Sequence, residues 1–512
     1  MSQAINPIIT GFAPDPSLVK VGEWYFLVTS SFHMFPGLPV YVSKDLGSWK
    51  QIGNVINRRT QLSLALSDTR LSPLSKPDEF MLATGGLYAP TIRYDDGTFY
   101  VVCTNVKHLN SEKSTYANFI VSTTLEGIWS DEWSDPIYFD FHGIDPSLYI
   151  ADDGRAYIQG SAAPGPYTTM NMFEVDLSTG AKLSDEKVIW RGTGGIYPEG
   201  PHLYQKDGWF YLLISEGGTH EGHMLTMARS RDIWGPYEAC PRNPILTAFG
   251  TDEYVQCTGH CDVFQDDKGQ WWGVCLGIRR GDGGRGIMGR ETFLTPGSWD
   301  GEWLSLALVK SHVEGIPQAR EKLSAKSGVD FLYIRDAVLE NYRVDKRSAR
   351  LTATPIDFSD PERSPTFVGK RQRSLTGKST VFIPNFIQYR GHGSIKLGIA
   401  VYKDEHRYVR IYHESDRNRI VFEIVSNAKK IAKTESHVVQ GATSTNALGL
   451  RIEYTDNEYR LLYTYHDETN WQCLATVDTL EMTDSDFTGP VIGVFAVATE
   501  AIGVQFEGLE ID

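Results

Sequence analysis

One pattern of hydrophobic and polar positions occurs five times in the first part of the chain. Each time, a turn that contains glycine leads into a strand of aromatic and aliphatic residues, as in Asp207-Gly-Trp-Phe-Tyr-Leu-Leu. Asp-Gly between hydrophobic strands is a strong hairpin signal. A short apolar strand precedes each turn, and a third strand often follows. The turn glycines are Gly22, Gly97, Gly154, Gly208 and Gly269.

A unit of about four short strands that occurs five times is typical of a five-bladed β-propeller. We therefore expect residues 1–312 to form such a propeller. Residues 313–328 are polar, and we expect them to form a linker.

Residues 329–512 show longer strands in which apolar and polar residues alternate. Alternation with one hydrated face predicts an antiparallel β-sandwich. No long amphipathic helix is evident, so the whole chain is predicted to be all-β. The clearest strands of the sandwich lie at 379–383, 394–402, 407–413, 419–425 and 459–465.

Candidate chemistry lies where the innermost strand of each repeat begins. Counting back from the turn glycines aligns Asp15, Pro90, Asp145, Glu199 and His260. Innermost strands line the central channel, so three acids and an imidazole should converge there. Acidic groups in a channel are unfavourable unless they are hydrated, paired or functional. The alternative is that Asp-Pro and Glu-Gly-Pro serve only as turn sequences.

Two clustered carboxyl groups in different surroundings are what glycoside hydrolysis requires. One must be a protonated acid for the departing oxygen, and the other a base or nucleophile. A third carboxylate beside the acid would raise the pKa of that acid by like-charge repulsion.

Composition narrows the choice of partners and compartment. The 512-residue chain has a net charge of −15, which disfavours nucleic acid. No stretch approaches the ~20 apolar residues of a membrane helix, and no signal peptide is evident at the start. Six sparse cysteines indicate buried free thiols in a reducing compartment. We therefore expect a cytoplasmic protein, unless a signal peptide has been removed.

Several motifs, in this order, resemble glycoside hydrolase family 43, and above all its two-domain β-xylosidases. The resemblance is strong over residues 5–310 and looser beyond. It implies a catalytic propeller followed by a concanavalin-like sandwich. The motifs are Phe12-Ala-Pro-Asp-Pro-Ser, Gly143-Ile-Asp-Pro-Ser-Leu, Glu199-Gly-Pro-His-Leu-Tyr, Glu216-Gly-Gly-Thr, Gly259-His and Gly289-Arg-Glu-Thr.

The resemblance also implies roles for the three acids. Asp15 would be the general base and Glu199 the general acid, while Asp145 would tune the pKa of the acid and orient the sugar. Arg290 is similar to an arginine of the family that contacts substrate. The alternative for Arg290 is a structural ion pair with Glu291.

Further substrate contacts are implied for Thr219, His260, Phe32, Tyr88 and Phe487. Phe32 would close on the terminal sugar, with a role in the core as the alternative, and Phe487 would reach the pocket mouth from the sandwich. Tyr88 stands where many relatives carry tryptophan, so this subsite departs from the family pattern. His260 matches a channel histidine that, in several members, contacts a water-coordinated calcium or another ion. No cofactor is otherwise implied.

The activity implied is an exo-acting, inverting hydrolase that releases xylose from the non-reducing ends of β-1,4-xylooligosaccharides. The family also contains α-L-arabinofuranosidases and dual enzymes, which would remove arabinose from arabinoxylan fragments. A non-catalytic sugar-binding propeller is a more remote alternative, since all three acids are present here. Related two-domain enzymes are often homo-oligomers.

Overall fold

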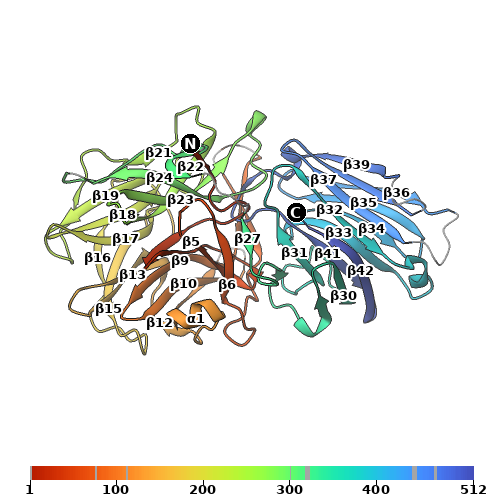
Figure 1. Cartoon of the computed structure of the whole chain (residues 1–512), viewed down its shortest axis with the longest axis horizontal. Coiled ribbons are helices and arrows are strands. Elements are labelled where there is room, and N and C mark those ends of the chain that lie inside the picture. Colours follow the sequence, from red (N-terminus) through yellow and green to blue (C-terminus); the bar gives the residue numbers. More distant parts are fainter. Residues whose placement is uncertain are drawn as a thin grey trace.

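The computed structural model describes residues 3–74, 76, 78–110, 113–299, 301–317, 323–440, 447–465 and 470–511. The fold is all-β, and within these ranges the single α-helix is α1 (Leu125–Ser130). Two strand-rich parts, N-terminal and C-terminal, lie side by side (Figure 1). Short 3-10 turns occur at Asp282–Gly284, Leu339–Asn341, Phe386–Tyr389 and Thr479–Met482. No described helix is long and apolar enough to cross a bilayer.

The N-terminal part contains five sheets of four or five strands. As predicted, each turn glycine joins the first two strands of a sheet with a positive φ. In chain order the sheets are β2 (Ser17–Val21), β3 (Trp24–Val28), β5 (Gly37–Ser43) and β6 (Lys50–Ile56) with β27 (Ser324–Ala325); β9 (Gly86–Asp95), β10 (Thr98–His108), β11 (Ser114–Thr124) and β12 (Ile137–Phe139); β13 (Gly143–Ile150), β14 (Ala156–Ala162), β15 (Thr169–Val175) and β16 (Lys187–Trp190); β17 (Glu199–Lys206), β18 (Trp209–Glu216), β19 (Met224–Ser230), β20 (Glu238–Ala239) and β21 (Leu246–Thr247); and β22 (Val255–Gln265), β23 (Trp271–Arg279), β24 (Glu291–Ser298) and β25 (Ser305–Leu306).

The first strands of these sheets are neighbours in a closed sequence. Strand β2 contacts β9, β9 contacts β13, β13 contacts β17, β17 contacts β22, and β22 contacts β2. The five strands therefore surround one central region, and residues at equivalent positions on them can meet there.

A buried polar network joins these five inner strands. Arg93 Nη1 donates to Asp262 Oδ2 at 2.8 Å, and Arg93 Nη2 lies 3.1 Å from His202 Nδ1. Ser17 Oγ donates to Asp262 Oδ2 at 2.7 Å, and Ser147 Oγ lies 3.1 Å from His202 Nδ1. Each inner strand supplies one of the five residues, so the network connects all five sheets.

The charges in this network are paired in a dry environment. Burial raises the pKa of Asp262, but Arg93 and His202 outweigh it and leave that pKa below its usual range. Tyr204 also donates its hydroxyl to Asp262 Oδ1 at 2.6 Å. A buried ion pair requires such additional hydrogen bonds to offset its desolvation.

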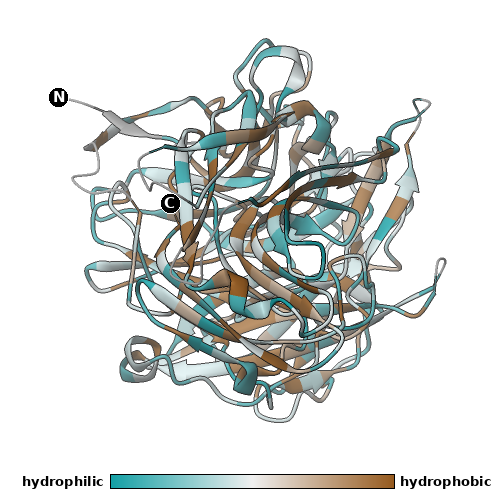
Figure 2. Ribbon diagram, turned by 90° about the vertical axis from the view of Figure 1, so that its right-hand side faces the viewer, coloured by the Kyte–Doolittle hydropathy of each residue, from teal (hydrophilic) through white to brown (hydrophobic). Residues whose placement is uncertain are grey.

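The C-terminal part is a sandwich of a seven-stranded and a six-stranded sheet around one hydrophobic core. The view toward this end shows hydrophobic residues gathered on strands and hydrophilic residues on peripheral loops (Figure 2). The first sheet has the order β29 (Tyr342–Val344), β30 (Ser348–Ala353), β42 (Ile502–Glu510), β32 (Gly377–Ile383), β37 (Leu448–Tyr454), β38 (Glu458–Thr464) and β39 (Gln472–Asp478); the second has the order β31 (Phe367–Arg371), β41 (Val491–Ala498), β33 (Ile395–Asp404), β34 (Arg407–Glu414), β35 (Arg419–Ser426) and β36 (Ile431–Val438).

Strands β33 and β34 differ from the predicted pattern of one hydrated face. Nearly all of their residues are buried, because the second face of the six-stranded sheet lies against the N-terminal part. Phe32 and Met34 share a hydrophobic cluster there with Tyr402. Arg410, between Tyr408 and Tyr412 of that face, is consequently buried, and it pairs with Asp357 and Glu423.

The predicted linker is largely bound to the N-terminal part. Strand β26 (His312–Pro317) pairs with β1 (Gln3–Ile5), and β27 pairs with β6 in parallel. Residues 318–322 lie outside the described residues. Strands this short carry no periodic signal, so the sequence could not predict these pairings.

Two further short pairings connect the parts. Strand β28 (Tyr333–Ile334) pairs with β4 (Met34–Phe35). Strand β40 (Ser485–Asp486) pairs with β8 (Phe80–Thr84), which also pairs with β7 (Thr69–Pro73). Five cysteines are buried free thiols, as expected, whereas Cys473 is exposed.

The substitution Asp262→Ala should lower the free energy of unfolding by about 3–5 kcal/mol, because it leaves the Arg93 guanidinium buried without a counter-charge. The double variant Arg93→Met, Asp262→Leu should lose less, since no charge is then left unpaired. Urea denaturation followed by tryptophan fluorescence measures both. As a control, Arg58→Ala removes an exposed ion pair with Asp135 and should change little. An Asp262→Ala loss no larger than that of the control would contradict the prediction.

Candidate active site

A left-handed backbone conformation marks the start of every inner strand. Non-glycine residues rarely adopt a positive φ, and such strain gathers at functional sites. The five residues are Asp15 (φ 55°), Ala89 (φ 40°), Asp145 (φ 52°), Gly200 (φ 59°) and His260 (φ 44°).

This conformation corrects the alignment made by counting along the sequence. In β9 the backbone equivalent of Asp15 is Ala89, one residue before Pro90. In β17 it is Gly200, one residue after Glu199. The turns that follow differ in length, because Lys206 pairs with Trp209 whereas Ile150 pairs with Ala156 and Gln265 with Trp271, and this displaces a count made from the turn glycine. A proline directly after the residue with the positive φ was the available sequence signal in four of the five strands.

Gly200 is confined by its neighbour. A Cβ atom on this residue would lie 2.9 Å from His260 Nδ1, and the φ of +59° also favours glycine. The glycine of the Glu199-Gly-Pro motif therefore lets β17 approach β22 closely, which brings Glu199 toward the region of His260 and Asp15.

Asp15 is held by three groups and its side chain is 8% exposed. Ser30 Oγ donates to Asp15 Oδ2 at 2.5 Å, and Arg290 Nη1 donates to Asp15 Oδ1 at 3.5 Å. His260 Nδ1 lies 3.7 Å from the same Oδ1. Ser30 Oγ in turn accepts from the Ala89 N–H at 2.7 Å. The carboxylate is therefore fixed in orientation but not closed off from water.

Asp145 and Glu199 form a carboxyl pair. The Gly200 N–H donates to Asp145 Oδ2 at 3.1 Å. Burial raises the pKa of Asp145, and the charges of Glu199 and Asp15 raise it further. Neighbouring carboxyl groups titrate together, so the pair keeps a proton to higher pH than an isolated aspartate does. The side chain of Glu199 is 21% exposed, which leaves it the more accessible member.

His223, which the sequence did not single out, faces Glu199. Its Nε2 lies 3.4 Å from Glu199 Oε1, and its Nδ1 lies 3.1 Å from the Cys257 carbonyl oxygen. A carbonyl only accepts, so Nδ1 donates to it, and Nε2 lies beside the Glu199 carboxyl without a hydrogen-bond partner among the described residues. The ring is fully buried, and a Cβ atom on Gly259 would lie 2.3 Å from it. In the sequence, only Gly259 indicated that another side chain packs closely here.

Arg290 reaches toward the carboxylates instead of forming the alternative ion pair. Its Nη1 donates to Thr219 Oγ1 at 2.9 Å and its Nη2 to the Phe487 carbonyl oxygen at 3.3 Å. Glu291 pairs with Arg279 at 2.7 Å. Arg290 and Glu291 are consecutive at the start of β24, where successive side chains point to opposite faces.

Three predicted aromatic residues form one cluster next to Arg290. The ring centroids of Phe32 and Tyr88 are 5.3 Å apart, and the Phe487 ring is 5.7 Å from each. The Arg290 guanidinium lies 4.7 Å from the Phe487 centroid and 5.4 Å from that of Phe32. Phe32 is 1% exposed, so it also serves the core, as its alternative role predicts.

Phe487 is positioned by ion pairs that the preceding residue, Asp486, makes within the sandwich. Asp486 accepts from Lys403 Nζ and from Arg407 Nη1, and all three side chains are buried. Burial raises the pKa of Asp486, but the two cations outweigh it and leave that pKa lowered. The Phe487 N–H donates to the Leu82 carbonyl at 3.2 Å. An ion cluster of the sandwich and a strand of the N-terminal part together fix this ring.

The residues near His260 do not form a calcium site of their own. Calcium takes about six to eight oxygen ligands. Across the described ranges, no group of three or more His, Cys, Asp or Glu side chains is arranged to hold a metal ion. His260 faces the Asp15 carboxylate, and its ring lies 6.4 Å from that of His202. A calcium contact through water stays a prediction, and no step below depends on it.

A glycoside hydrolase requires two carboxyl groups in different surroundings. This site has three carboxyl groups beside an arginine and an aromatic cluster. Residues 4–304 match the profile of glycosyl hydrolases family 43. Residues 324–506 match that of the β-xylosidase C-terminal concanavalin A-like domain. The chain belongs to glycoside hydrolase family 43.

Similar proteins cover nearly the whole chain. A non-reducing end α-L-arabinofuranosidase of Bacteroides ovatus is 33% identical over 96% of this chain and 90% of its own length. A xylosidase/arabinosidase of Humicola insolens is 30% identical over 99% of this chain and 93% of its own length. The crystal structure of a xylan β-1,4-xylosidase from Bacillus halodurans superimposes with a TM-score of 0.85, at 27% identity, over 99% of this chain and 100% of that one.

His223→Ala should lower kcat/KM on aryl xylosides by about tenfold to a hundredfold, because Glu199 loses the group that orients it. The fold should survive, and circular dichroism checks this. His312→Ala, an exposed histidine on β26, is the matched control and should leave kcat/KM unchanged. Full activity of the His223 variant would show that Glu199 needs no such partner.

Proposed function

We propose that this chain is an exo-acting, inverting β-xylosidase that releases xylose from the non-reducing ends of β-1,4-xylooligosaccharides. The observation that carries the proposal is the separation of one fixed carboxylate, Asp15, from a carboxyl pair, Asp145 and Glu199, that retains a proton. This division supplies a base and an acid. The match of the C-terminal part to a β-xylosidase domain supports the same substrate class.

The proposal includes a five-bladed β-propeller over residues 1–312, a connecting segment over 313–328 and the sandwich over 329–512. Five sheets whose inner strands neighbour one another in a closed sequence support the five blades. The polar network through Arg93 and Asp262 then lies in the central channel, behind the carboxyl groups.

In the proposed reaction Asp15 accepts a proton from water while the water oxygen bonds to the anomeric carbon. The glycosidic C–O bond breaks at the same time, and Glu199 gives its proton to the departing oxygen. The sugar is released with the opposite anomeric configuration. Asp145 helps the pair to keep its proton. Arg290 and Thr219 bind hydroxyl groups of the sugar. The rings of Tyr88 and Phe487 contact the terminal sugar.

Exo action is supported by the position of Phe487. This ring belongs to the sandwich, yet it packs on Phe32, Tyr88 and Arg290 of the N-terminal part. The sandwich therefore contributes a residue beside the carboxyl groups, which would hinder a continuous chain from passing through.

The second candidate is an α-L-arabinofuranosidase, alone or combined with xylosidase activity. It is favoured by the 33% identity to the Bacteroides ovatus α-L-arabinofuranosidase. The same base and acid would serve, and arabinoxylan fragments would be the substrate.

Proton NMR of xylobiose hydrolysis should show α-xylose appearing before mutarotation, because inversion converts a β-linkage into an α-product. Arabinosyl xylooligosaccharide measured in parallel tests the second candidate. Release of arabinose alone would reassign the substrate and keep the roles of the acids. First-formed β-xylose would overturn inversion, and inactivity on both substrates would favour a sugar-binding protein.

Glu199→Gln should lower kcat on xylobiose by about 10²–10⁴-fold, because the departing oxygen loses its proton donor. The loss should be smaller on 4-nitrophenyl xyloside, whose leaving group needs little protonation. Asp15→Asn is the matched comparison and should impair both substrates alike. Equal losses on both substrates for Glu199→Gln would contradict the acid role.

Asp145→Asn should shift the alkaline limb of the pH–kcat/KM profile to lower pH. Burial, and then the charges of Glu199 and Asp15, raise the pKa of Asp145, so this variant removes the carboxyl that holds a proton of the pair to higher pH. Initial rates on 4-nitrophenyl xyloside between about pH 4 and 9 measure the limb. A limb that stays in place or moves upward would rule out this role for Asp145.

A further inference from the structure

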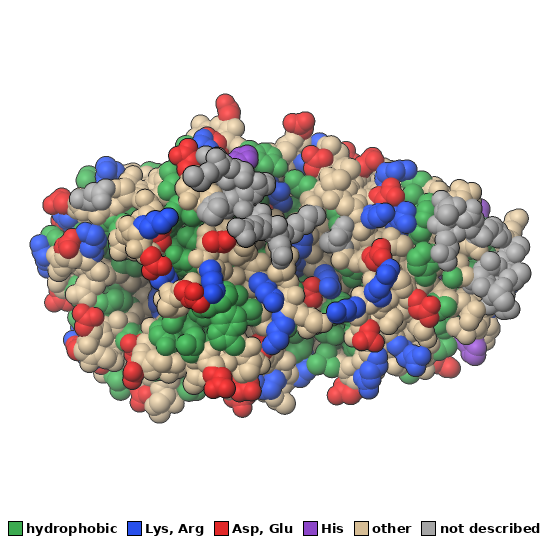
Figure 3. Space-filling view, in the orientation of Figure 1, with side chains coloured by type: hydrophobic (Ala, Val, Ile, Leu, Met, Phe, Trp, Pro, Cys, Tyr) green, Lys and Arg blue, Asp and Glu red, His purple; other side chains and the backbone are tan. Residues whose placement is uncertain are grey.

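A groove on the outside of the first sheet combines tryptophan rings with lysines. It lies between β6, α1 and β27 and has a volume of about 550 Å³. Its lining includes Trp24, Trp49, Trp129, Lys44, Lys50 and Lys326. The space-filling view shows a hydrophobic patch over α1 and β6 with basic side chains at its border (Figure 3).

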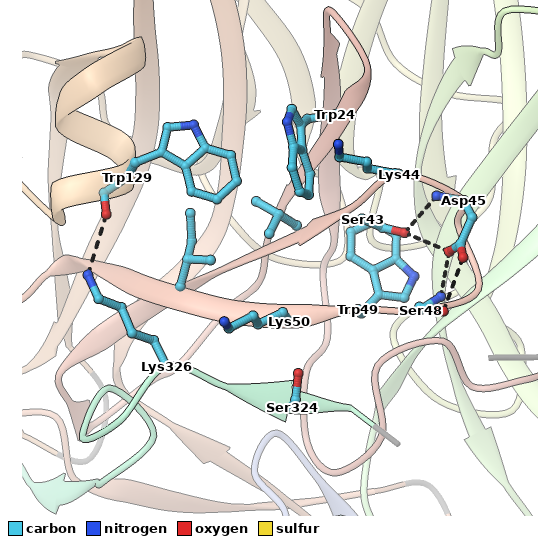
Figure 4. A pocket seen from close by; sticks show the side chains of 12 residues that line it. Trp24, Ser43, Lys44, Asp45, Ser48, Trp49, Lys50, Trp129, Ser324 and Lys326 are labelled. Carbon is cyan, nitrogen blue, oxygen red and sulfur yellow. Dashed lines mark hydrogen bonds between the residues drawn. The ribbon is translucent and has the colours of Figure 1, made fainter. Parts of the chain in front are cut away.

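Trp24 and Trp129 form an apolar corner of the groove. Their ring centroids are 4.9 Å apart with the planes at 70°, and both residues are only partly buried. Figure 4 shows the two rings side by side, with Lys50 and Lys326 across from them. Lys44 Nζ lies over the Trp24 ring, 4.4 Å from its centroid, whereas the Trp129 ring has no such cation among the described residues.

Two of the three lysines of the groove form no ion pair with the described residues. Lys44 pairs with Glu23 at 2.6 Å, but in the described part of the chain neither Lys50 nor Lys326 has a carboxylate within ion-pair distance. Lys326 Nζ contacts only the Trp129 carbonyl oxygen, at 3.4 Å.

The acid of the groove is engaged elsewhere. Asp45 accepts from Gly47 and Ser48 of its own turn, at 3.0 Å and 2.7 Å. On a chain with a net charge of −15, the lining of this groove thus has three lysines and one carboxylate.

We propose that this groove binds an acidic oligosaccharide, namely a xylooligosaccharide that bears a uronic acid branch. The apolar face of a pyranose suits the corner between Trp24 and Trp129, since indole rings offer a large apolar surface with a polar edge. The carboxylate of the branch suits Lys50 and Lys326. The choice of a xylose backbone rests on the proposed function, whereas the need for an apolar face and a carboxylate comes from the groove itself.

The groove is separate from the carboxyl groups of the active site. Its residues lie on the outer strands of the first sheet, on α1 and on β27, whereas Asp15, Asp145 and Glu199 lie at the starts of inner strands. Binding here would hold an acidic branch of a fragment at the surface without occupying the site of hydrolysis.

The test is isothermal titration of the Asp15→Asn chain, which should not turn its ligands over, with two probes. These are xylotriose and xylotriose carrying one glucuronic acid. The acidic probe should occupy one site more than xylotriose does. Adding Trp129→Ala should weaken that additional site by about tenfold or more, and Lys50→Glu with Lys326→Glu by about tenfold. Raising NaCl from about 50 mM to about 500 mM should weaken it as well.

Controls separate this site from the active site and from a contact between chains. With Asp15 intact, Trp129→Ala should leave kcat on 4-nitrophenyl xyloside unchanged, and Lys433→Glu on the sandwich should leave acidic binding unchanged. The inference is overturned if both probes bind equally, if the groove variants bind the acidic probe normally, or if those variants instead change the sedimentation coefficient. If the chain hydrolyses no xyloside but still binds the acidic probe in a way that depends on Trp129, the inference about the groove stands and the proposed function fails.

Discussion

The buried pair of Arg93 and Asp262 is the interaction on which the arrangement of the inner strands depends. Together with Ser17, Ser147 and His202, it connects five strands from five sheets. A charge pair of this kind is tolerated inside a protein only when its remaining hydrogen bonds are satisfied, which makes its geometry specific. The functional side chains lie at or next to the starts of the same strands, so their relative positions follow from this network.

The sandwich completes the site from outside. One face of its six-stranded sheet is buried against the N-terminal part, and the β33–β34 hairpin also carries the buried cations Lys403 and Arg407. These cations hold Asp486, and the next residue, Phe487, packs against Arg290 and the aromatic cluster. The ring of Phe487 is thus positioned by an ion cluster of the sandwich.

Electrostatics divide the three acids into two kinds. Asp15 faces Arg290, His260 and the hydroxyl of Ser30, and so has partners suited to a carboxylate. Asp145 is buried beside Glu199, and its burial, followed by the charges of Glu199 and Asp15, raises its pKa. The buried ring of His223 lies on the side of Glu199. The proposed base and acid functions therefore rest on different surroundings, although the residue types are nearly the same.

The sequence by itself determined the all-β class, the five glycine turns, most strands of the sandwich and the family, because local periodicity and short motifs carry that information. It also selected Asp15, Asp145 and Glu199 as candidates from their place in the repeat. Only the tertiary structure decided the approach of His223 and the burial of β33 and β34. These features arise from contacts between segments far apart in the chain, and no local pattern of hydrophobic and polar residues encodes such contacts.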